Sequence, residues 1–295
     1  MKKNTKDSIV IGFALFSMFF WAGNLIFPGF LGNELGSKFF IGMIGFIMTG
    51  VGLPLLAIIA CSKGDGTFES IASKIGPKFV AIFTTLIFIA IGPLLAVPRT
   101  AATTYEMSVK PFLPGIPAIV VIALYFIINL FFVLRRSAIV DTIGKVLTTA
   151  LLILLVLIIV KGIVSPIGTI TETDIEGALS SSLLQGYQTM DALAALLFAA
   201  IITTAIKDKG YGLKDMPSMI FKSSFIAALG LAFVYGGLMY IGAQTTSSVD
   251  IDALGKTGLL LYIAKSTLGS AGHAVIGLAM GLACLSTSIG LITAG

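Results

Sequence analysis

The sequence predicts an all-α polytopic membrane protein, and three observations support that prediction. Of the 295 residues, 57% are hydrophobic and only 11% are charged, whereas a soluble domain has about 25% charged residues. The mean hydropathy is +1.04. The apolar residues form long continuous runs, unlike the short alternating segments of a β-barrel. This composition excludes a soluble globular domain and a disordered chain.

Uncharged runs identify the membrane spans, because a helix needs about 20 apolar residues to cross a bilayer. Six such runs are 8–33, 39–62, 79–98, 111–134, 223–249 and 266–295. Two further apolar stretches contain charged residues. About eight transmembrane helices are therefore predicted, near residues 8–29, 39–60, 79–104, 115–134, 141–163, 183–206, 219–245 and 273–295. Residues 258–269 are too short to cross and are expected to form an outer helix.

The basic residues predict the orientation of the chain. With the N-terminus in the cytoplasm, most of the 19 Lys and Arg residues fall in cytoplasmic segments, as the positive-inside rule requires. The isoelectric point near 9.1 therefore reflects topology and does not indicate a nucleic-acid partner, because the basic residues are dispersed. We expect a multi-pass membrane protein with its N-terminus in the cytoplasm and with the lipid bilayer as its surroundings.

The first span combines a glycine, a polar residue and a proline in its second half. Pro28 lacks an N–H and clashes with the carbonyl of Asn24. Gly23 loosens the same turn. These residues predict an unwound helix near residues 22–25, where a protein or water-filled environment must satisfy the backbone. A simple proline kink is the alternative.

The sixth span carries a polar cluster of Gln188, Thr189 and Asp191. Asp191 has two possible roles. It fits the N-cap of a helix that restarts at Ala192 after a break, which is the favoured interpretation. It also fits a charged partner for a cation or a substrate. Either role implies a discontinuous helix.

The two predicted breaks are five spans apart. Because five is odd, the span with the second break enters the membrane from the side opposite to the first. Broken helices in matched positions are typical of an inverted-topology repeat whose binding site lies near the midplane. We expect residues 1–164 to form a first five-helix repeat and residues 165–295 a partial second repeat.

The eighth span adds a run of hydroxyl groups at Ser286, Thr287 and Ser288. Hydroxyl and carbonyl oxygens suit a hard cation such as Na⁺. Small polar residues also serve ordinary helix packing. Beside two broken helices, an ion site is the favoured interpretation.

Four segments resemble the motifs of the bacterial branched-chain amino acid:cation symporters, namely residues 22–28, 91–101, 186–194 and 283–287. The resemblance implies a LeuT-type five-plus-five inverted repeat, with the first and sixth helices discontinuous. It also implies Na⁺-driven uptake of leucine, isoleucine and valine across the bacterial cytoplasmic (inner) membrane. Members of that family have about twelve spans, so this chain of about eight resembles a C-terminally truncated symporter.

The resemblance also implies a substrate site between the broken helices. The carboxylate of the amino acid would meet backbone N–H groups of Ala22, Gly23 and Asn24. Its ammonium would meet carbonyls from Tyr187 through Gln188 and Thr189 to Met190. Its aliphatic chain would need a dry pocket. The candidate residues for that pocket are Trp21, Phe27, Tyr187 and Phe198.

The sodium site implied by the resemblance joins the first and eighth helices. Carbonyls just before the first break would fall among Ser17 to Trp21, with Ser17 and Phe20 as the predicted pair. The eighth helix would supply the Ala283 carbonyl and the hydroxyls of Ser286 and Thr287. Ser288 replaces one of them if the register shifts by one residue.

Arg99 and Glu106 fall on one face of the third span and form either an outer gate or an interfacial anchor. No catalytic residues and no cofactor other than Na⁺ as coupling ion are expected, because the chain has one histidine and no nucleotide-binding motif. The protein is thus expected not to be an enzyme. Two alternatives to a sodium-coupled symporter stay open. One is a proton-coupled transporter in which Asp191 titrates, and the other is an inactive fragment of a longer symporter. The sequence does not predict an oligomeric state.

Overall fold

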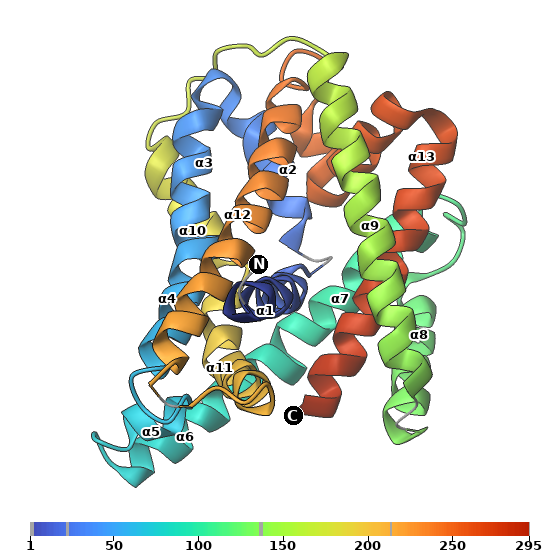
Figure 1. The fold of residues 1–295 in the computed structure, drawn as a ribbon. Helices are drawn as coiled ribbons and strands as arrows, with labels where there is room; N and C mark the ends of the chain where they lie inside the picture. The colour runs from blue at the N-terminus through green and yellow to red at the C-terminus, as the bar shows by residue number, and fades with distance from the viewer. Residues whose placement is uncertain (1–2, 22–23, 136–137, 213, 295) are drawn as a thin grey trace.

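The computed structural model describes residues 3–21, 24–135, 138–212 and 214–294, and these residues form an all-helical bundle (Figure 1). The fold-class prediction of an all-α protein is confirmed. The helices are α1 (Lys3–Phe19), α2 (Ile26–Leu35), α3 (Phe39–Ile47), α4 (Leu53–Cys61), α5 (Phe68–Ala72), α6 (Pro77–Ile89), α7 (Ala96–Thr104), α8 (Ala118–Arg135), α9 (Ala138–Val164), α10 (Ala178–Tyr187), α11 (Asp191–Asp208), α12 (Met216–Ala243) and α13 (Ile251–Ala294).

Short π-helical turns join some of these helices into longer rods. Residues Met48–Gly52 connect α3 to α4, and Ala90–Leu94 connect α6 to α7. Residues Tyr105–Val109 extend α7. By length and hydropathy, four helical stretches of the described residues can cross a membrane, and a fifth is the bent pair α10 and α11. The predicted number of eight spans stays a prediction.

The first predicted break is present in the structure. Helix α1 ends at Phe19 and α2 begins at Ile26. The Phe19 carbonyl at the end of α1 accepts a hydrogen bond from the Tyr235 hydroxyl of α12, at 3.4 Å. A break inside an apolar span leaves carbonyls without helical partners, so Tyr235 stabilises the broken end. Ala22 and Gly23 lie outside the described residues.

The second break separates α10 from α11. The two helices are bent by 44° relative to each other. Met190 takes a left-handed conformation with a φ of 66°, and it is the one described residue other than glycine with a positive φ. This conformation costs free energy in a residue with a side chain, and such strain clusters at functional sites.

Glycines divide α13 into the segment between Gly255 and Gly269, which we call the outer segment after its predicted position, and a final helical stretch. Gly255 and Gly269 have φ values of 66° and 74° within this helix. Only glycine adopts this region without a steric cost, so the chain turns at both positions. The outer helix expected at residues 258–269 corresponds to the segment between these two turns.

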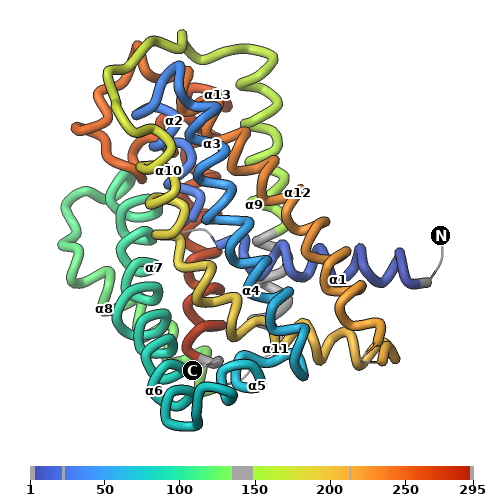
Figure 2. The backbone as a smooth tube through the Cα atoms, turned by 90° about the vertical axis from the view of Figure 1, so that its left-hand side faces the viewer, coloured from blue at the N-terminus to red at the C-terminus, as the bar shows by residue number. Residues whose placement is uncertain are grey.

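The pairing of helices brings the two parts of the sequence together. Helix α12 packs along both α1 and α2, while α3 packs on α10, α4 on α11, and α13 on α7 and α9. Figures 1 and 2 show α12 running beside α2 in the middle of the molecule, with α1 lying across the direction of the other helices. The unwound segment after Phe19 lets α1 and α2 take these different directions.

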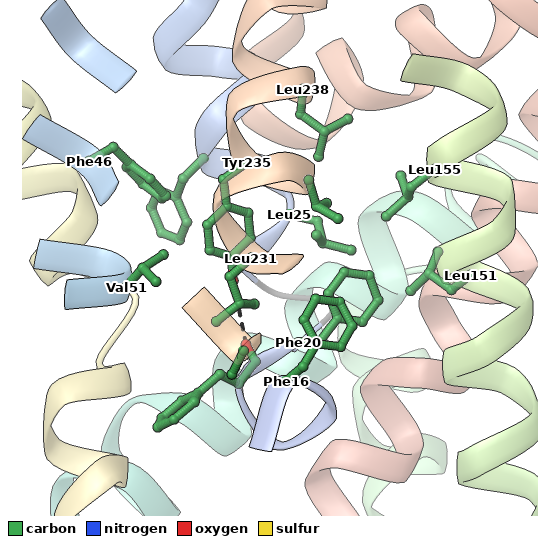
Figure 3. Close-up of a cluster of buried hydrophobic side chains, with 14 of the residues drawn as sticks. Phe16, Phe20, Leu25, Phe46, Val51, Leu151, Leu155, Leu231, Tyr235 and Leu238 are labelled. Atoms are coloured by element: carbon green, nitrogen blue, oxygen red, sulfur yellow. Dashed lines mark hydrogen bonds between the residues drawn. The ribbon is translucent and has the colours of Figure 1, made fainter. Parts of the chain in front are cut away.

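The core beneath the first break is aromatic and aliphatic (Figure 3). The rings of Phe16 and Phe20 stack with their centroids 5.0 Å apart. Phe46 of α3 meets Tyr235 of α12 edge to face at 5.5 Å. Leu25 is fully buried in the same cluster. This packing holds the end of α1 and the start of α2 in place on either side of the first break.

Candidate functional site

The two helix breaks are joined by one pair of buried side chains. The Nδ2 atom of Asn24, at the start of α2, donates to both carboxylate oxygens of Asp191 at 2.9 Å. Both residues are completely buried. A carboxylate inside an apolar protein requires such hydrogen bonds, because an unpaired buried charge is very costly. The Asn24–Asp191 contact therefore couples the conformations of the two breaks.

The interpretation of Asp191 as a helix N-cap is wrong. Met190 occupies the N-cap position of α11, and no side chain caps this helix. Asp191 is the first residue of α11, and its carboxylate is directed to Asn24 instead of to the next turn. Its own backbone N–H lies 3.4 Å from the Thr189 hydroxyl. The left-handed Met190 shifts the helix start by one residue, which sequence reasoning did not anticipate.

Arg99 of α7 contacts both breaks at once. Its Nη1 donates to the Gln188 carbonyl at 3.0 Å, and its Nη2 to the Thr189 carbonyl at 3.2 Å. Nη2 also donates to the Asn24 Oδ1 atom at 3.2 Å. The guanidinium lies 5.7 Å from the centroid of the Phe27 ring, within cation–π range. Arg99 is thus part of this site, and the interfacial-anchor interpretation does not fit it.

Glu106, the suggested gate partner of Arg99, lies elsewhere. It is exposed and accepts a hydrogen bond from the Thr257 hydroxyl at 2.8 Å, at the outer segment of α13. Another cation lies closer to the site. The Lys256 Nζ atom is 4.5 Å from the Phe27 ring centroid and 2.8 Å from the Gln185 Oε1 atom. Arg99 and Lys256 therefore approach the same aromatic ring.

The aromatic candidates fall into three places. Trp21 is buried, and its ring meets Phe198 of α11 edge to face at 6.1 Å. Phe27 lies under the two cations. Tyr187 is 50% exposed. The structure thus brings Trp21 and Phe198 together, and it places Phe27 beside Arg99 and Lys256.

An apolar cavity of about 970 Å³ opens beside Phe198. Its walls come from the π-helical turn after α6, from α7, α8 and α11, and from the end of α13. Trp21 belongs to the same buried apolar cluster as two of the lining residues, Ile91 and Ala194. The cavity is large enough for a small amino acid, since ligand pockets measure about 300–1,000 Å³.

The two halves of the expected ion site show different surroundings. Ser17 is exposed and its hydroxyl donates to the Ala14 carbonyl of its own helix at 3.0 Å. Phe20 is buried. On α13, Ala283 is buried while Ser286 and Thr287 are half-buried. No hydrogen bond within the described part of the chain joins the α1 residues to these α13 residues.

Ser288, the alternative ligand, belongs to a buried polar cluster that sequence reasoning missed. The Tyr125 hydroxyl of α8 lies 3.0 Å from the Thr100 hydroxyl and donates to the Cys284 carbonyl at 2.9 Å. Asn129 and Ser288 are buried nearby. This cluster connects α7, α8 and α13, and polar residues at regular intervals in apolar helices are the signal that predicts it.

The role of Arg99 was also missed, although a signal was present. Arg99 and Asp191 carry opposite charges, and both stand in segments that are otherwise apolar. Charged residues within a membrane segment pair with one another or with backbone carbonyls. Arg99 meets the two carbonyls of the second break directly, and it reaches Asp191 through Asn24.

Comparisons with known proteins identify the family. The family model described as branched-chain amino acid transport protein matches residues 4–295. The branched-chain amino acid permease BraB of Bacillus subtilis is 39% identical over 98% of this chain and 66% of its own length. The branched-chain amino acid permease BrnQ of Bacillus subtilis is 39% identical over 97% of this chain and 67% of its own.

A third relative extends the comparison to another genus. The branched-chain amino acid transport system 2 carrier protein of Pseudomonas aeruginosa is 39% identical over 98% of this chain and 67% of its own length. The chain spans about two thirds of the length of these relatives. They are permeases and carriers, not enzymes, and their names together with the apolar helices mark a multi-pass membrane protein. The chain therefore belongs to the branched-chain amino acid transport protein family.

Proposed function

We propose that the protein is a sodium-coupled symporter that imports leucine, isoleucine and valine across the cytoplasmic membrane by alternating access. The observation that carries the proposal is the junction of two broken helices by Asn24 and Asp191, in a chain of this family. Transporters with broken helices bind substrate and coupling ions at the breaks. The proposal includes the LeuT-type inverted repeat and a cytoplasmic N-terminus.

The substrate would lie between the breaks and beside the cavity near Phe198. Its ammonium would be bound by the Gln188 and Thr189 carbonyls, which already accept hydrogen bonds from a cation. Its carboxylate would meet the N–H groups of the first break, in the segment that includes Ala22, Gly23 and Asn24. The buried Trp21 ring and the half-buried Phe198 ring suit an aliphatic side chain, which needs no polar partner.

The coupling ion would use neutral oxygens. The described residues contain no group of three or more His, Cys, Asp or Glu side chains that could hold a metal ion. The Ala283 carbonyl and the hydroxyls of Ser286 and Thr287 offer the oxygen ligands that a hard cation prefers. Ser17 and Phe20 would complete this site through their backbone carbonyls, after α1 moves toward α13.

Leucine uptake into proteoliposomes tests the coupling. Uptake is expected to require an inward Na⁺ gradient. Thr287→Ala is expected to raise the Na⁺ concentration for half-maximal uptake about tenfold, because one oxygen ligand is lost. The control is Thr204→Ala, since Thr204 is exposed and bonds only to the Ala200 carbonyl of its own helix among the described contacts. An unchanged Na⁺ titration in Thr287→Ala would contradict the α13 site.

A proton-coupled transporter is the second candidate, and the complete burial of Asp191 favours it. A buried carboxylate in a transporter is a recurrent element of proton relays. Equal uptake in choline buffer under a proton gradient would support this candidate and exclude the sodium assignment. The same measurement on the 295-residue chain decides whether it transports at all.

A further inference from the structure

The Arg99 guanidinium lies where the second break exposes its carbonyls. Nη1 is 3.0 Å from the Gln188 oxygen, and Nη2 is 3.2 Å from the Thr189 oxygen. Carbonyls in the last turn of a helix have no N–H partner four residues on, so a cation is well placed there. These are the carbonyls that the proposed function assigns to the ammonium of the substrate.

Two cations do not share these carbonyls at low cost. An ammonium bound at Gln188 and Thr189 would stand beside the guanidinium in a site with little water, where like charges repel strongly. The Arg99 side chain would have to release the carbonyls as the ammonium arrives. The guanidinium already lies 5.7 Å from the centroid of the Phe27 ring, and this cation–π contact would remain when the carbonyls are released.

A zwitterion has a partner for each group in this exchange, because its ammonium can bind the carbonyls and its carboxylate can bind the guanidinium. We propose that Arg99 is a tethered cation, which holds the Gln188 and Thr189 carbonyls in the absence of substrate and yields them to the ammonium of an amino acid. The carboxylate of that amino acid then pairs with the guanidinium, beside Asn24. The proposal rests on the proposed function for its substrate class.

The charges around the site agree with this exchange. Asn24 lies between the guanidinium and the Asp191 carboxylate and bonds to both, so the charges of Arg99 and Asp191 balance each other before substrate enters. A zwitterion adds no net charge. An amine without a carboxylate would leave two positive charges together, and Lys256 adds a third near the Phe27 ring. The arrangement therefore selects against cations and in favour of neutral amino acids.

Three ligands of one carbon skeleton separate the contributions. They share the isobutyl side chain and are leucine, 3-methylbutylamine (leucine without its carboxylate) and 4-methylpentanoate (leucine without its amine), and binding is measured on the purified chain in lipid nanodiscs. In Arg99→Gln, leucine binding is expected to weaken about tenfold or more, because a charged hydrogen-bonded pair is lost. Amine binding is expected to tighten about tenfold, because no guanidinium competes for the carbonyls. Binding of 4-methylpentanoate is expected to be lost.

The decisive result is that Arg99→Gln weakens leucine binding and tightens amine binding. A merely structural role for Arg99 would weaken leucine and amine binding together, and that outcome overturns the proposal. Lys110→Gln is the matched control, because Lys110 is exposed at the end of the same span, and it should change neither affinity.

If Arg99→Gln does not fold, Arg99→Lys serves instead, since a lysine keeps the charge but cannot bond both carbonyls as the planar guanidinium does. Arg99→Lys should weaken leucine binding several-fold and leave amine binding unchanged or tighter, and a parallel loss of both again overturns the proposal.

The same data distinguish this proposal from the proposed function. A wild-type chain that binds no leucine, isoleucine or valine counts against the proposed substrate. An amine affinity that is equal in the wild type and in Arg99→Gln counts against the role of Arg99, whatever amino acid the chain carries.

Discussion

The side-chain nitrogen of Asn24 lies 2.9 Å from each carboxylate oxygen of Asp191. The two residues belong to different broken helices, and each is completely buried. Neither side chain would be stable alone in an apolar bundle, because each would leave polar atoms unpaired. The contact makes the geometry of one break depend on the geometry of the other. An alternating-access mechanism needs such a dependence between its moving parts.

The energetic coupling of this pair is the first prediction. A double-mutant cycle with Asn24→Ala and Asp191→Ala is expected to give a coupling free energy of about 1.5–3 kcal/mol, the range for a hydrogen bond to a charged group. The free energy of unfolding is measured by denaturant titration in mixed micelles. Asn24→Ala combined with Asp174→Ala is the control cycle, since Asp174 is exposed in the segment before α10. Additive effects in the main cycle would contradict the coupling.

The charge of Asp191 is the subject of the second prediction. Asp191→Asn keeps the size of the side chain but removes the negative charge that balances Arg99, and it sets one amide against another at Asn24. Leucine uptake is expected to fall at least about tenfold. Asp174→Asn should leave uptake unchanged. Full uptake by Asp191→Asn would show that hydrogen bonding and not charge is what this position requires.

Sequence reasoning located both breaks but not the contact between them. Pro28 and Gly23 predict an interruption in the first span because their backbone chemistry is local. The left-handed conformation of Met190 has no local signal, since methionine rarely adopts it, and this residue moves Asp191 out of the capping position.

The partners of Arg99 depend on tertiary structure in the same way. Its two carbonyl acceptors are 89 and 90 residues away in the sequence, and no pattern of spacing predicts that distance. The membrane class follows from composition alone, because few charged residues cannot cover so much apolar surface in water.

The close approach of α2 and α12 gives the third prediction. A Cβ atom on Gly242 would collide with the backbone of Gly29, and one on Gly32 would collide with the backbone of Met239. Glycine lets two membrane helices pack backbone to backbone. Gly242→Ala is expected to lower the free energy of unfolding by about 1–3 kcal/mol, because the two helices must separate.

Gly290→Ala is the matched control for Gly242→Ala. Gly290 lies within α13, and a Cβ atom there would meet nothing within 4 Å. Since alanine favours helices more than glycine does, this variant should be neutral or more stable by up to about 1 kcal/mol. Equal effects of the two substitutions would contradict the argument from close packing.

The turn before α5 gives the fourth prediction, which concerns pH. The Thr67 hydroxyl and backbone N–H donate to Asp65 Oδ1 at 2.7 and 3.0 Å. These hydrogen bonds lower the pKa of Asp65 below its usual range, and the bond from the Thr67 hydroxyl has the largest effect. A carboxylate whose folded pKa is lowered stabilises the turn above its unfolded pKa of about 3.9, and this contribution is lost as the pH falls through the lower folded pKa.

The pKa of Asp65 is measured from the ¹³C shift of its carboxyl carbon during an NMR titration of the labelled protein. In Thr67→Val the hydroxyl donor is gone, so the pKa of Asp65 is expected to rise toward its ordinary value. Thr204→Val, which changes an exposed hydroxyl on α11, should leave it unchanged. Thr67 also accepts a hydrogen bond from the Ser70 N–H at the start of α5, so the amide signal of Ser70 reports whether that helix remains capped. A pKa of Asp65 that is ordinary in the wild type, or identical in Thr67→Val, would contradict the assignment of these hydrogen bonds.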